Sequence, residues 1–373
     1  MKNTILTFCC ILLQQSLFAE NKDWLIDGSP YKTEVNLSSD KKQIELTNGL
    51  LRRSFSLTPN GATIALDNLM TGQNELRAVR PEAVLVINGK EYPVGGLEGQ
   101  PVHNFLTKDF LSGMQLCDSA FVLAGYTVSE TKERFPWKPN EAWISNRYPW
   151  PAPGKRITFT YRAPRKIVDE CKGLTIRIVY ELYDGAPILS KWIEIENNGQ
   201  KAVTLDSFKS EVLALVETAP KVHYGEPHEV RMMAQKTGYY TEDYRKRPVQ
   251  TDAPRDYIDR FTQLFVVTDY AMGGDMEAMK DNPAVRWVFD HPEYEFTGIR
   301  YYGQYKPARL EVTPLLGPAE EIAPGEKIRY IMIWLLKCLS IKMKSISKNG
   351  SAVTQTVATE NRPKTRIRLG RIC

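Results

Sequence analysis

Long apolar runs, metal-binding patterns and nucleotide-binding loops are all missing from this chain of 373 residues. No stretch reaches the ~18 apolar residues that a membrane-spanning helix needs. The cysteines form no CxxC pair or zinc pattern, and His223 and His228 are five apart, a spacing that suits neither one helix face nor one strand face. A glycine-rich phosphate loop and a GxSxG nucleophile elbow are also absent. We therefore expect no metal, no cofactor and no membrane partner for the mature protein.

Net positive charge is missing outside the C-terminal tail. The net charge is +5, but residues 337–373 hold nine basic residues and one acid, and Lys2 is the single charge before residue 20. The stretch 20–335 is therefore −4, and no aromatic residue follows Trp334. A nucleic-acid surface needs clustered basic residues, usually with aromatic rings for stacking. We expect no nucleic-acid partner.

The N-terminus resembles a secretory signal peptide. Lys2 provides the positive region, residues 5–13 form a short apolar run, and Ser16 to Ala19 offers a cleavage site. Cleavage after residue 19 would send the protein to the periplasm or the outside of the cell. The mature chain would then keep four cysteines, of which Cys117 and Cys171 could form a disulfide or stay as two buried thiols.

The C-terminal residues 336–373 differ in character from the rest, being basic and without a clear hydrophobic period. One hypothesis is that a frameshift or premature truncation after about residues 325–327 produced this tail. The alternative is a basic tail that is simply disordered.

Period-two alternation dominates the remaining chain and predicts β-strands. It is clearest at 174–182 and 188–196, which flank an Asp-Gly-Ala-Pro turn, and 84–87 and 92–94 flank the hairpin pair Asn88-Gly89. Further strands are expected at 43–47, 202–208, 261–267, 286–289 and 309–312. Residues 211–217 and 276–280 allow single helical turns at most. This spacing predicts an all-β fold with few short helices, arranged as a large antiparallel sandwich.

One segment, residues 134–156, concentrates aromatic and proline residues and is expected to be a loop. Flat rings can pack on the C–H faces of sugars, while neighbouring polar groups reach the hydroxyls. The candidate carbohydrate-binding residues are Trp137, Trp143, Asn146, Arg147, Tyr148 and Trp150. The alternative is that these large aromatics cover the sandwich or dock a neighbouring domain.

Candidate catalytic residues are harder to nominate. A glycosidase needs two carboxyl groups roughly 5–10 Å apart, which spacing along the chain cannot show. The cluster Asp252, Asp256 and Asp259 fits a solvated loop as well as a site. The catalytic residues stay unknown at this stage.

Two stretches resemble known carbohydrate-active proteins. Residues 44–53, with Asn48-Gly49 between two strands, resemble the entry to the galactose-mutarotase-like β-supersandwich. Residues 180–187, followed by Ser190-Lys191-Trp192 and 196–199, are similar to the central hairpin in the N-terminal domain of glycoside hydrolases of the α-galactosidase clan. The resemblance implies a lead-in at 20–39 and a β-supersandwich at 40–335.

In that clan the sandwich precedes a (β/α)₈ barrel that carries the catalytic carboxylates. The resemblance therefore implies a non-catalytic N-terminal domain, truncated before its barrel, with a glycan or oligosaccharide as partner and the barrel as the partner in the full-length parent. A stand-alone carbohydrate-binding protein and an aldose epimerase are the alternatives. An epimerase needs a histidine pair and a glutamate, for which His103, His223 and Glu311 are the candidates.

Overall fold

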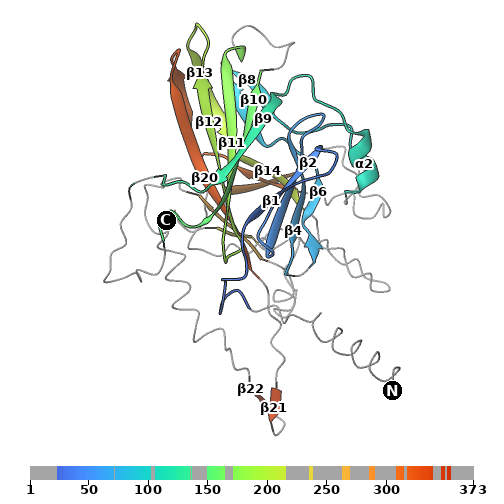
Figure 1. Ribbon diagram of the computed structural model, residues 1–373. Coiled ribbons are helices and arrows are strands. Elements are labelled where there is room, and N and C mark those ends of the chain that lie inside the picture. Colours follow the sequence, from blue (N-terminus) through green and yellow to red (C-terminus); the bar gives the residue numbers. More distant parts are fainter. Residues whose placement is uncertain are drawn as a thin grey trace, which may run out of the picture.

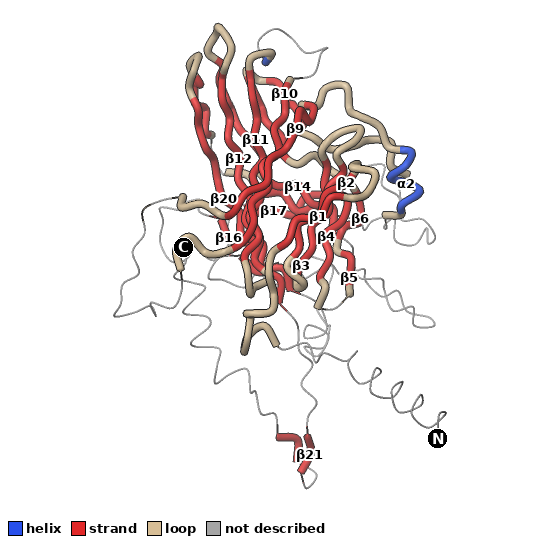
Figure 2. The backbone as a smooth tube through the Cα atoms, in the orientation of Figure 1, coloured by secondary structure: helices blue, strands red, loops and turns tan. Residues whose placement is uncertain are grey.

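The computed structural model describes residues 23–70, 72–101, 106–134, 136, 149–163, 171–215, 235–237, 263–268, 285–289, 308–314, 317–338, 346–348 and 351–353. Strands dominate these residues, and α2 (Lys108–Gly113) is the one α-helix in the described part of the chain (Figure 1; Figure 2). Thr107 caps that helix by accepting a hydrogen bond from the Phe110 amide. The expected all-β class, with few short helices, is confirmed.

The largest sheet has seven strands in the order β15-β16-β20-β12-β11-β10-β9. Its strands are β9 (Val122–Glu130), β10 (Gly154–Arg162), β11 (Leu174–Tyr183), β12 (Ile188–Asn197), β15 (Gln235–Thr237), β16 (Gln263–Thr268) and β20 (Lys327–Cys338). All neighbours pair antiparallel except β15 and β16. The strands expected at 174–182 and 188–196 are confirmed as the hairpin β11–β12.

Three further sheets pack with this one. The five-stranded sheet contains β1 (Glu34–Leu37), β2 (Gln43–Thr47), β3 (Leu51–Ser56), β4 (Ala62–Asn68) and β5 (Gln73–Asn74). The first four-stranded sheet contains β19 (Pro318–Ile322), β13 (Val203–Lys209), β7 (Ala83–Ile87) and β8 (Lys90–Val94). The second contains β17 (Val285–Phe289), β18 (Ala308–Val312), β14 (Glu211–Leu215) and β6 (Leu76–Ala78). A two-stranded pair, β21 (Ile346–Lys348) and β22 (Ser351–Val353), completes the strands.

The helical turn allowed at 211–217 is wrong. Residues Glu211–Leu215 form β14, and all five are buried. Pairing with β6 and β18 supplies the hydrogen bonds that a single isolated helical turn would lack. Because only Ser210 separates β13 from β14, one continuous stretch of chain serves both four-stranded sheets. The turn allowed at 276–280 lies outside the described residues.

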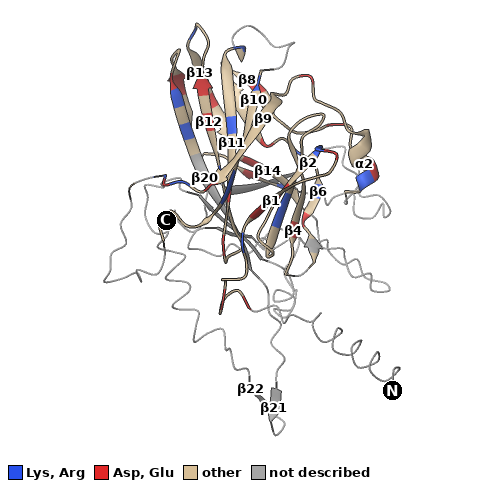
Figure 3. Ribbon diagram, in the orientation of Figure 1, with Lys and Arg blue, Asp and Glu red and all other residues tan. Residues whose placement is uncertain are grey.

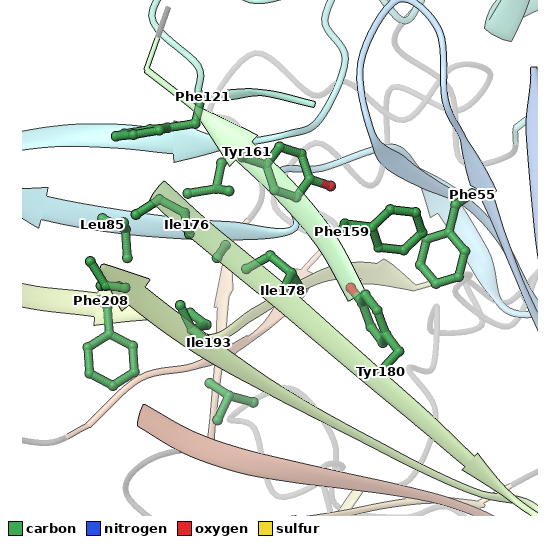
Figure 4. Packing of buried hydrophobic residues seen from close by; sticks show 14 of the residues in the cluster. Phe55, Leu85, Phe121, Phe159, Tyr161, Ile176, Ile178, Tyr180, Ile193 and Phe208 are labelled. Atoms are coloured by element: carbon green, nitrogen blue, oxygen red, sulfur yellow. The ribbon is translucent and has the colours of Figure 1, made fainter. Parts of the chain in front are cut away.

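The hydrophobic core lies on one face of the seven-stranded sheet. Alternate residues of β10, β11 and β12 point into it, among them Phe159, Ile178, Tyr180 and Ile193 (Figure 4). Phe55 of β3 lies 4.8 Å from Phe159 and 4.9 Å from Tyr180 between ring centroids. Such tilted aromatic contacts add to the free energy of burial. The opposite residues of the same strands therefore form an outer face, turned away from this core.

Local turn chemistry fixes the hairpins. Asn88 and Gly89 both have positive φ, 50° and 74°, as a two-residue turn between β7 and β8 requires. Asn48 has a longer reach. Its amide nitrogen donates to the carbonyls of Tyr183 and Ala186, 2.8 Å in each case, and its carboxamide oxygen accepts from Leu50 and Leu51. The two stretches that carry the family resemblance are thus hydrogen-bonded to each other.

The segment before β1 packs on the turn between β11 and β12. The Thr33 amide donates to the Asp184 carboxylate at 2.8 Å, and the Gly185 amide donates to the Tyr31 carbonyl at 2.7 Å. Gly28 lies so close to Gly185 that an added Cβ would meet its carbonyl oxygen at 2.5 Å. A side chain at position 28 would therefore push this segment off the β11–β12 turn.

The chain beyond Lys327 enters the centre of the large sheet. β20 pairs with β12 on one side and with β16 on the other, from Lys327 to Cys338. The sheet thus includes residues on both sides of position 327. The origin of the tail beyond β20 stays a prediction.

Candidate functional site

The aromatic segment expected at 134–156 connects β9 to β10. It is shorter than expected, because residues 154–156 already belong to β10, where they pair with β9 and β11. Of the six candidate residues, Trp150 is described and is half-buried. Trp137, Trp143, Asn146, Arg147 and Tyr148 lie outside the described residues. The base of the segment is held by Thr131, whose amide donates to the Gly154 carbonyl and whose hydroxyl donates to the Ala152 carbonyl at 2.6 Å.

Both ends of this segment converge on one tryptophan and one carboxylate of the outer face. Arg156 donates twice to Glu181, from Nε at 2.8 Å and from Nη2 at 2.5 Å. Arg134 Nε lies 3.8 Å from the other oxygen of Glu181. The guanidinium carbons of Arg134 and Arg156 lie 5.6 Å and 5.1 Å from the ring centroid of Trp192. Cation–π attraction and ion pairing therefore fix residues twenty-two positions apart at one place.

A second carboxylate holds the other side of Trp192. The indole Nε1 donates to Glu194 at 3.1 Å, and Arg329 of β20 donates to the same oxygen at 2.9 Å from Nη2. Lys327 pairs with the other Glu194 oxygen at 2.7 Å. A third guanidinium, that of Arg329, lies 5.8 Å from the Trp192 ring. Trp192 is only 1% exposed although it belongs to the outer face. We name Arg134, Arg156, Glu181, Trp192, Glu194 and Arg329 the tryptophan anchor.

The ion pairs of the anchor keep the Glu194 carboxylate ionised. Burial alone raises the pKa of Glu194, but hydrogen bonds and ion pairs with Lys327, Trp192 and Arg329 outweigh it and hold the pKa at about 2. Burial and the nearby Glu181 carboxylate raise the pKa of Tyr183 far above its usual range. Tyr183 therefore stays protonated, and it donates to Glu181 at 2.8 Å.

Both carboxylates of the anchor are engaged in ion pairs. Glu181 lies opposite Ser190, so Glu194 lies four residues further along β12. At about 3.3 Å per residue the two backbone positions are roughly 13 Å apart, and each carboxylate is held in an ion pair with an arginine. The depressed pKa of Glu194 also removes it as a proton donor at neutral pH. The arrangement suits a rigid support for the aromatic segment.

A second charged cluster lies inside the core. Arg53 of β3 forms a forked pair with Glu211 of β14, at 2.7 Å and 3.2 Å, and donates to Thr63 at 2.9 Å. Lys191 of β12 donates to the same carboxylate at 2.7 Å. Glu82 lies 3.5 Å from Arg53 and accepts a short hydrogen bond from Tyr180. The two positive charges of Arg53 and Lys191 thus balance the two negative charges of the carboxylates. We name Arg53, Glu82, Tyr180, Lys191 and Glu211 the buried ion cluster.

The buried ion cluster is structural. Its side chains are at most 1% exposed, so no substrate reaches them in this conformation. It joins the five-stranded, seven-stranded and second four-stranded sheets by charge-assisted hydrogen bonds. Removal of one partner would leave a charge without compensation in the core, which is strongly destabilising.

Stability is expected to fall in acid because of this cluster. Burial alone raises the pKa of Glu211, but Arg53 and Lys191 outweigh it and hold the pKa at about 2, below its usual 4.5. A carboxyl with a depressed folded pKa stabilises the fold above its unfolded pKa and loses that contribution as the pH falls. The urea midpoint should therefore hold above about pH 5 and drop steadily towards pH 2. A midpoint that stays constant from pH 6 to pH 3 would contradict this assignment.

Of the residues considered for an epimerase, Glu311 alone lies in the described part of the chain. His103 and His223 lie outside the described residues, as do Asp252, Asp256 and Asp259. Glu311 is described, and its carboxylate is held by Lys209 at 3.1 Å and Arg309 at 2.7 Å. Two ion pairs leave it poorly suited to act as a base.

The described part of the chain also settles the state of two cysteines. Cys117 and Cys171 are not joined by a disulfide, and Cys171 belongs to the hydrophobic core. The described residues hold no group of three or more His, Cys, Asp or Glu side chains placed to bind a metal ion. Among them, no helix has the length and apolar character to cross a membrane.

Sequence reasoning missed the tryptophan anchor. Ser190, Trp192 and Glu194 alternate along β12 with core residues, so a period-two pattern assigns them to the opposite face. The available signal was Trp192, a large aromatic residue on a face whose neighbouring positions, Ser190 and Glu194, are polar. The pairing of Glu194 with Arg329 joins residues 135 positions apart and leaves no local trace.

Comparison with known proteins gives structural likeness alone. No protein-family model and no curated protein sequence matches the chain. The GH36 α-galactosidase AgaB from Geobacillus stearothermophilus is 12% identical with a TM-score of 0.37, over 82% of this chain and 41% of that enzyme. An α-galactosidase from Lactobacillus brevis is 10% identical with a TM-score of 0.41, over 82% and 40% of the two chains.

A galactose mutarotase-like protein from Clostridium acetobutylicum is 12% identical with a TM-score of 0.33, over 83% of this chain and 99% of that protein. The chain thus spans less than half the length of the α-galactosidases and nearly all of the mutarotase-like protein. Every one of these TM-scores is below 0.5, so the likeness assigns no function to the chain.

Proposed function

We propose that this chain is a secreted or periplasmic, carbohydrate-related β-supersandwich domain of the kind found in glycoside hydrolases. In this proposal it contributes carbohydrate contacts through the segment between β9 and β10 and serves an α-galactosidase-like catalytic (β/α)₈ barrel. The observation that carries the proposal is the tryptophan anchor, which holds both ends of the most aromatic segment of the chain.

The anchor supports a binding role for a physical reason. A glycan that contacts a loop must order it, and each side chain that becomes immobile costs free energy. Arg134 and Arg156 are fixed before any ligand arrives, since their side chains are 8% and 14% exposed and pair with Glu181. Trp150 lies six residues before Arg156 in the chain, close to this fixed end of the segment. These two side chains are therefore already immobile in the folded protein, and ligand binding loses less conformational entropy.

The same residues favour a non-catalytic role for the sandwich. Glu181 and Glu194 are held in ion pairs with arginines, and the carboxylates of the buried ion cluster are sealed in the core. The catalytic carboxylates are therefore assigned to the barrel. This assignment predicts neither glycoside hydrolysis nor acceleration of anomer interconversion by this chain.

Glycan retention tests the proposal. The full chain should be retarded in affinity electrophoresis through a galactose-containing polysaccharide, and the double substitution Trp143→Ala, Trp150→Ala should abolish retention. Each lost stacking ring is expected to cost ~1–3 kcal/mol, by analogy with base stacking. Trp24→Ala is the matched control, because Trp24 is a half-buried tryptophan far from this segment in sequence, and it should leave retention unchanged.

Two results would contradict the proposal. One is equal mobility of the wild type with and without every glycan offered at millimolar concentration. The other is turnover of an aryl α-galactoside, or faster anomer interconversion, by the full chain alone.

A further inference from the structure

The outer face of the seven-stranded sheet carries more positive than negative charge. Basic residues form bands along β11 and β20 in Figure 3. Counted over β10, β11, β12 and β20 together with the anchored Arg134, the outer face holds six cations: Arg134, Arg156, Arg162, Arg177, Lys327 and Arg329. It holds three carboxylates: Glu181, Glu194 and Glu196. The face is thus +3 on a body whose residues 20–335 sum to −4.

One part of this face borders the tryptophan anchor, with Arg177 directly opposite Glu194 on β12, and is partly open to solvent. Arg162 is exposed, and the side chains of Arg177 and Glu196 are each 27% exposed. Arg162 lies opposite Thr175 on β11, two residues from Arg177, so the two arginines are diagonal neighbours on adjacent strands. Diagonal positions in a sheet are about 7–8 Å apart at their backbones. Two guanidinium groups can therefore reach one bound ligand.

The donors of these arginines are only partly used. Arg162 donates from Nη1 to the Thr175 hydroxyl at 2.5 Å, and Arg177 pairs through Nη2 with Glu196 at 2.6 Å. Arg177 Nη1 is buried without an acceptor among the described residues, so a ligand would meet Arg177 through its other guanidinium nitrogens. Thr158 and Thr160 of β10 lie half-buried on the same face and add hydroxyl groups. We name Thr160, Arg162, Arg177 and Glu196 the arginine patch.

We propose that the arginine patch binds a glycan that carries carboxylate groups, an acidic chain built with uronic acid residues. The inference rests on the proposed function and names the substrate class for it. A guanidinium fork matches a planar carboxylate, and the protein itself shows this pairing on the same face, in Arg156 with Glu181 and Arg177 with Glu196. The ligand carboxylate takes the place of Glu196 on Arg177, and Arg162 and the threonine hydroxyls reach its neighbours.

The local sign of charge supports an anionic ligand over a neutral one. The mildly acidic body repels polyanions, whereas the +3 face attracts them, so the field directs an acidic glycan to this sheet. A neutral galactoside would gain nothing from the excess of three positive charges. Because the patch is partly exposed, salt screens the attraction, and binding should weaken as ionic strength rises.

The test measures binding of oligogalacturonate to the full chain by calorimetry, with a neutral galacto-oligosaccharide and a sulfated galactan oligosaccharide as comparisons. Arg162→Gln with Arg177→Gln is expected to weaken oligogalacturonate binding about 10- to 100-fold, the range for loss of charged hydrogen bonds. Glu196→Gln removes the competing carboxylate and is expected to tighten binding several-fold. Lys90→Gln, which removes one exposed positive charge on β8, is the control and should change nothing.

Gain of affinity in Glu196→Gln is the decisive result, because a substitution that merely damaged the fold would not produce it. Binding of the neutral oligosaccharide alone, or preference for the sulfated one, would overturn this inference and leave the proposed function standing. Equal binding of polyglutamate would overturn it too, since it would reduce the effect to general charge attraction. Failure of all glycans to bind would overturn both.

Discussion

Replacing Arg53 by Met is expected to lower the free energy of unfolding by about 3–5 kcal/mol, the cost of breaking a buried ion pair from one side. The substitution leaves Glu211 and Glu82 in the core with Lys191 as their one cationic partner, and it removes the donor to Thr63. It also deletes the guanidinium that lies 4.6 Å from the Tyr180 ring centroid. Urea unfolding at pH 7, followed by circular dichroism, measures the change.

The neighbouring residue gives a matched control. Arg52 follows the same strand but faces the other way, where its side chain is 39% exposed and pairs with Asp67 at 2.7 Å. Arg52→Met should cost no more than about 1 kcal/mol, as partly exposed ion pairs do. Equal losses for Arg52→Met and Arg53→Met would show that the buried ion cluster does not hold the sheets together.

Replacing Trp192 by Ala is expected to cost about 3–5 kcal/mol and to free the aromatic segment. The change removes the ring against which Arg134, Arg156 and Arg329 lie, and it leaves a void on the sheet. Limited proteolysis should then cut between residues 134 and 153 faster than in the wild type. Urea unfolding measures the loss of stability in parallel.

Trp192→Phe separates the two contributions of this residue. Phenylalanine keeps a ring for the guanidinium groups but loses the hydrogen bond from the indole to Glu194. We expect a loss of about 1–2 kcal/mol with little change in proteolysis. If Trp192→Ala left the cutting rate of the segment unchanged, the anchor would have no role in holding its ends.

The fold class was accessible from sequence because its strongest signals are local. The β11–β12 hairpin combines strict alternation with Asp184 and Gly185, and Gly185 adopts the positive φ that the turn requires. β14 was missed because all five of its residues are buried, so its sequence does not alternate between polar and apolar residues. Its strand conformation depends on pairing with β18, which lies far along the chain. Neighbouring residues along the chain do not encode such partners.

Composition singles out the aromatic segment, its carbohydrate contacts stay a prediction, and the contacts that anchor its ends could not be predicted from the sequence. Composition pointed to the segment that ends at Trp150, and the structure shows what anchors its ends. The anchor and the buried ion cluster depend on contacts such as Arg53 with Glu211, 158 residues apart. Lys191 gave a sequence clue to the buried ion cluster, because it is a charged residue at a core position between Leu189 and Ile193. A lysine there requires a buried carboxylate, but alternation cannot name which one.

The place of β20 in the large sheet sets a condition on synthesis at the ribosome. β12 ends at Asn197, and its partner β20 begins at Lys327, 130 residues later. At a translation rate of about 5–20 residues per second, the edge of β12 stays without its partner strand for roughly 7–26 s. During this interval an unpaired strand edge can recruit other chains. Expression at lower ribosome density, or with a chaperone that shields strand edges, should therefore raise the yield of folded protein.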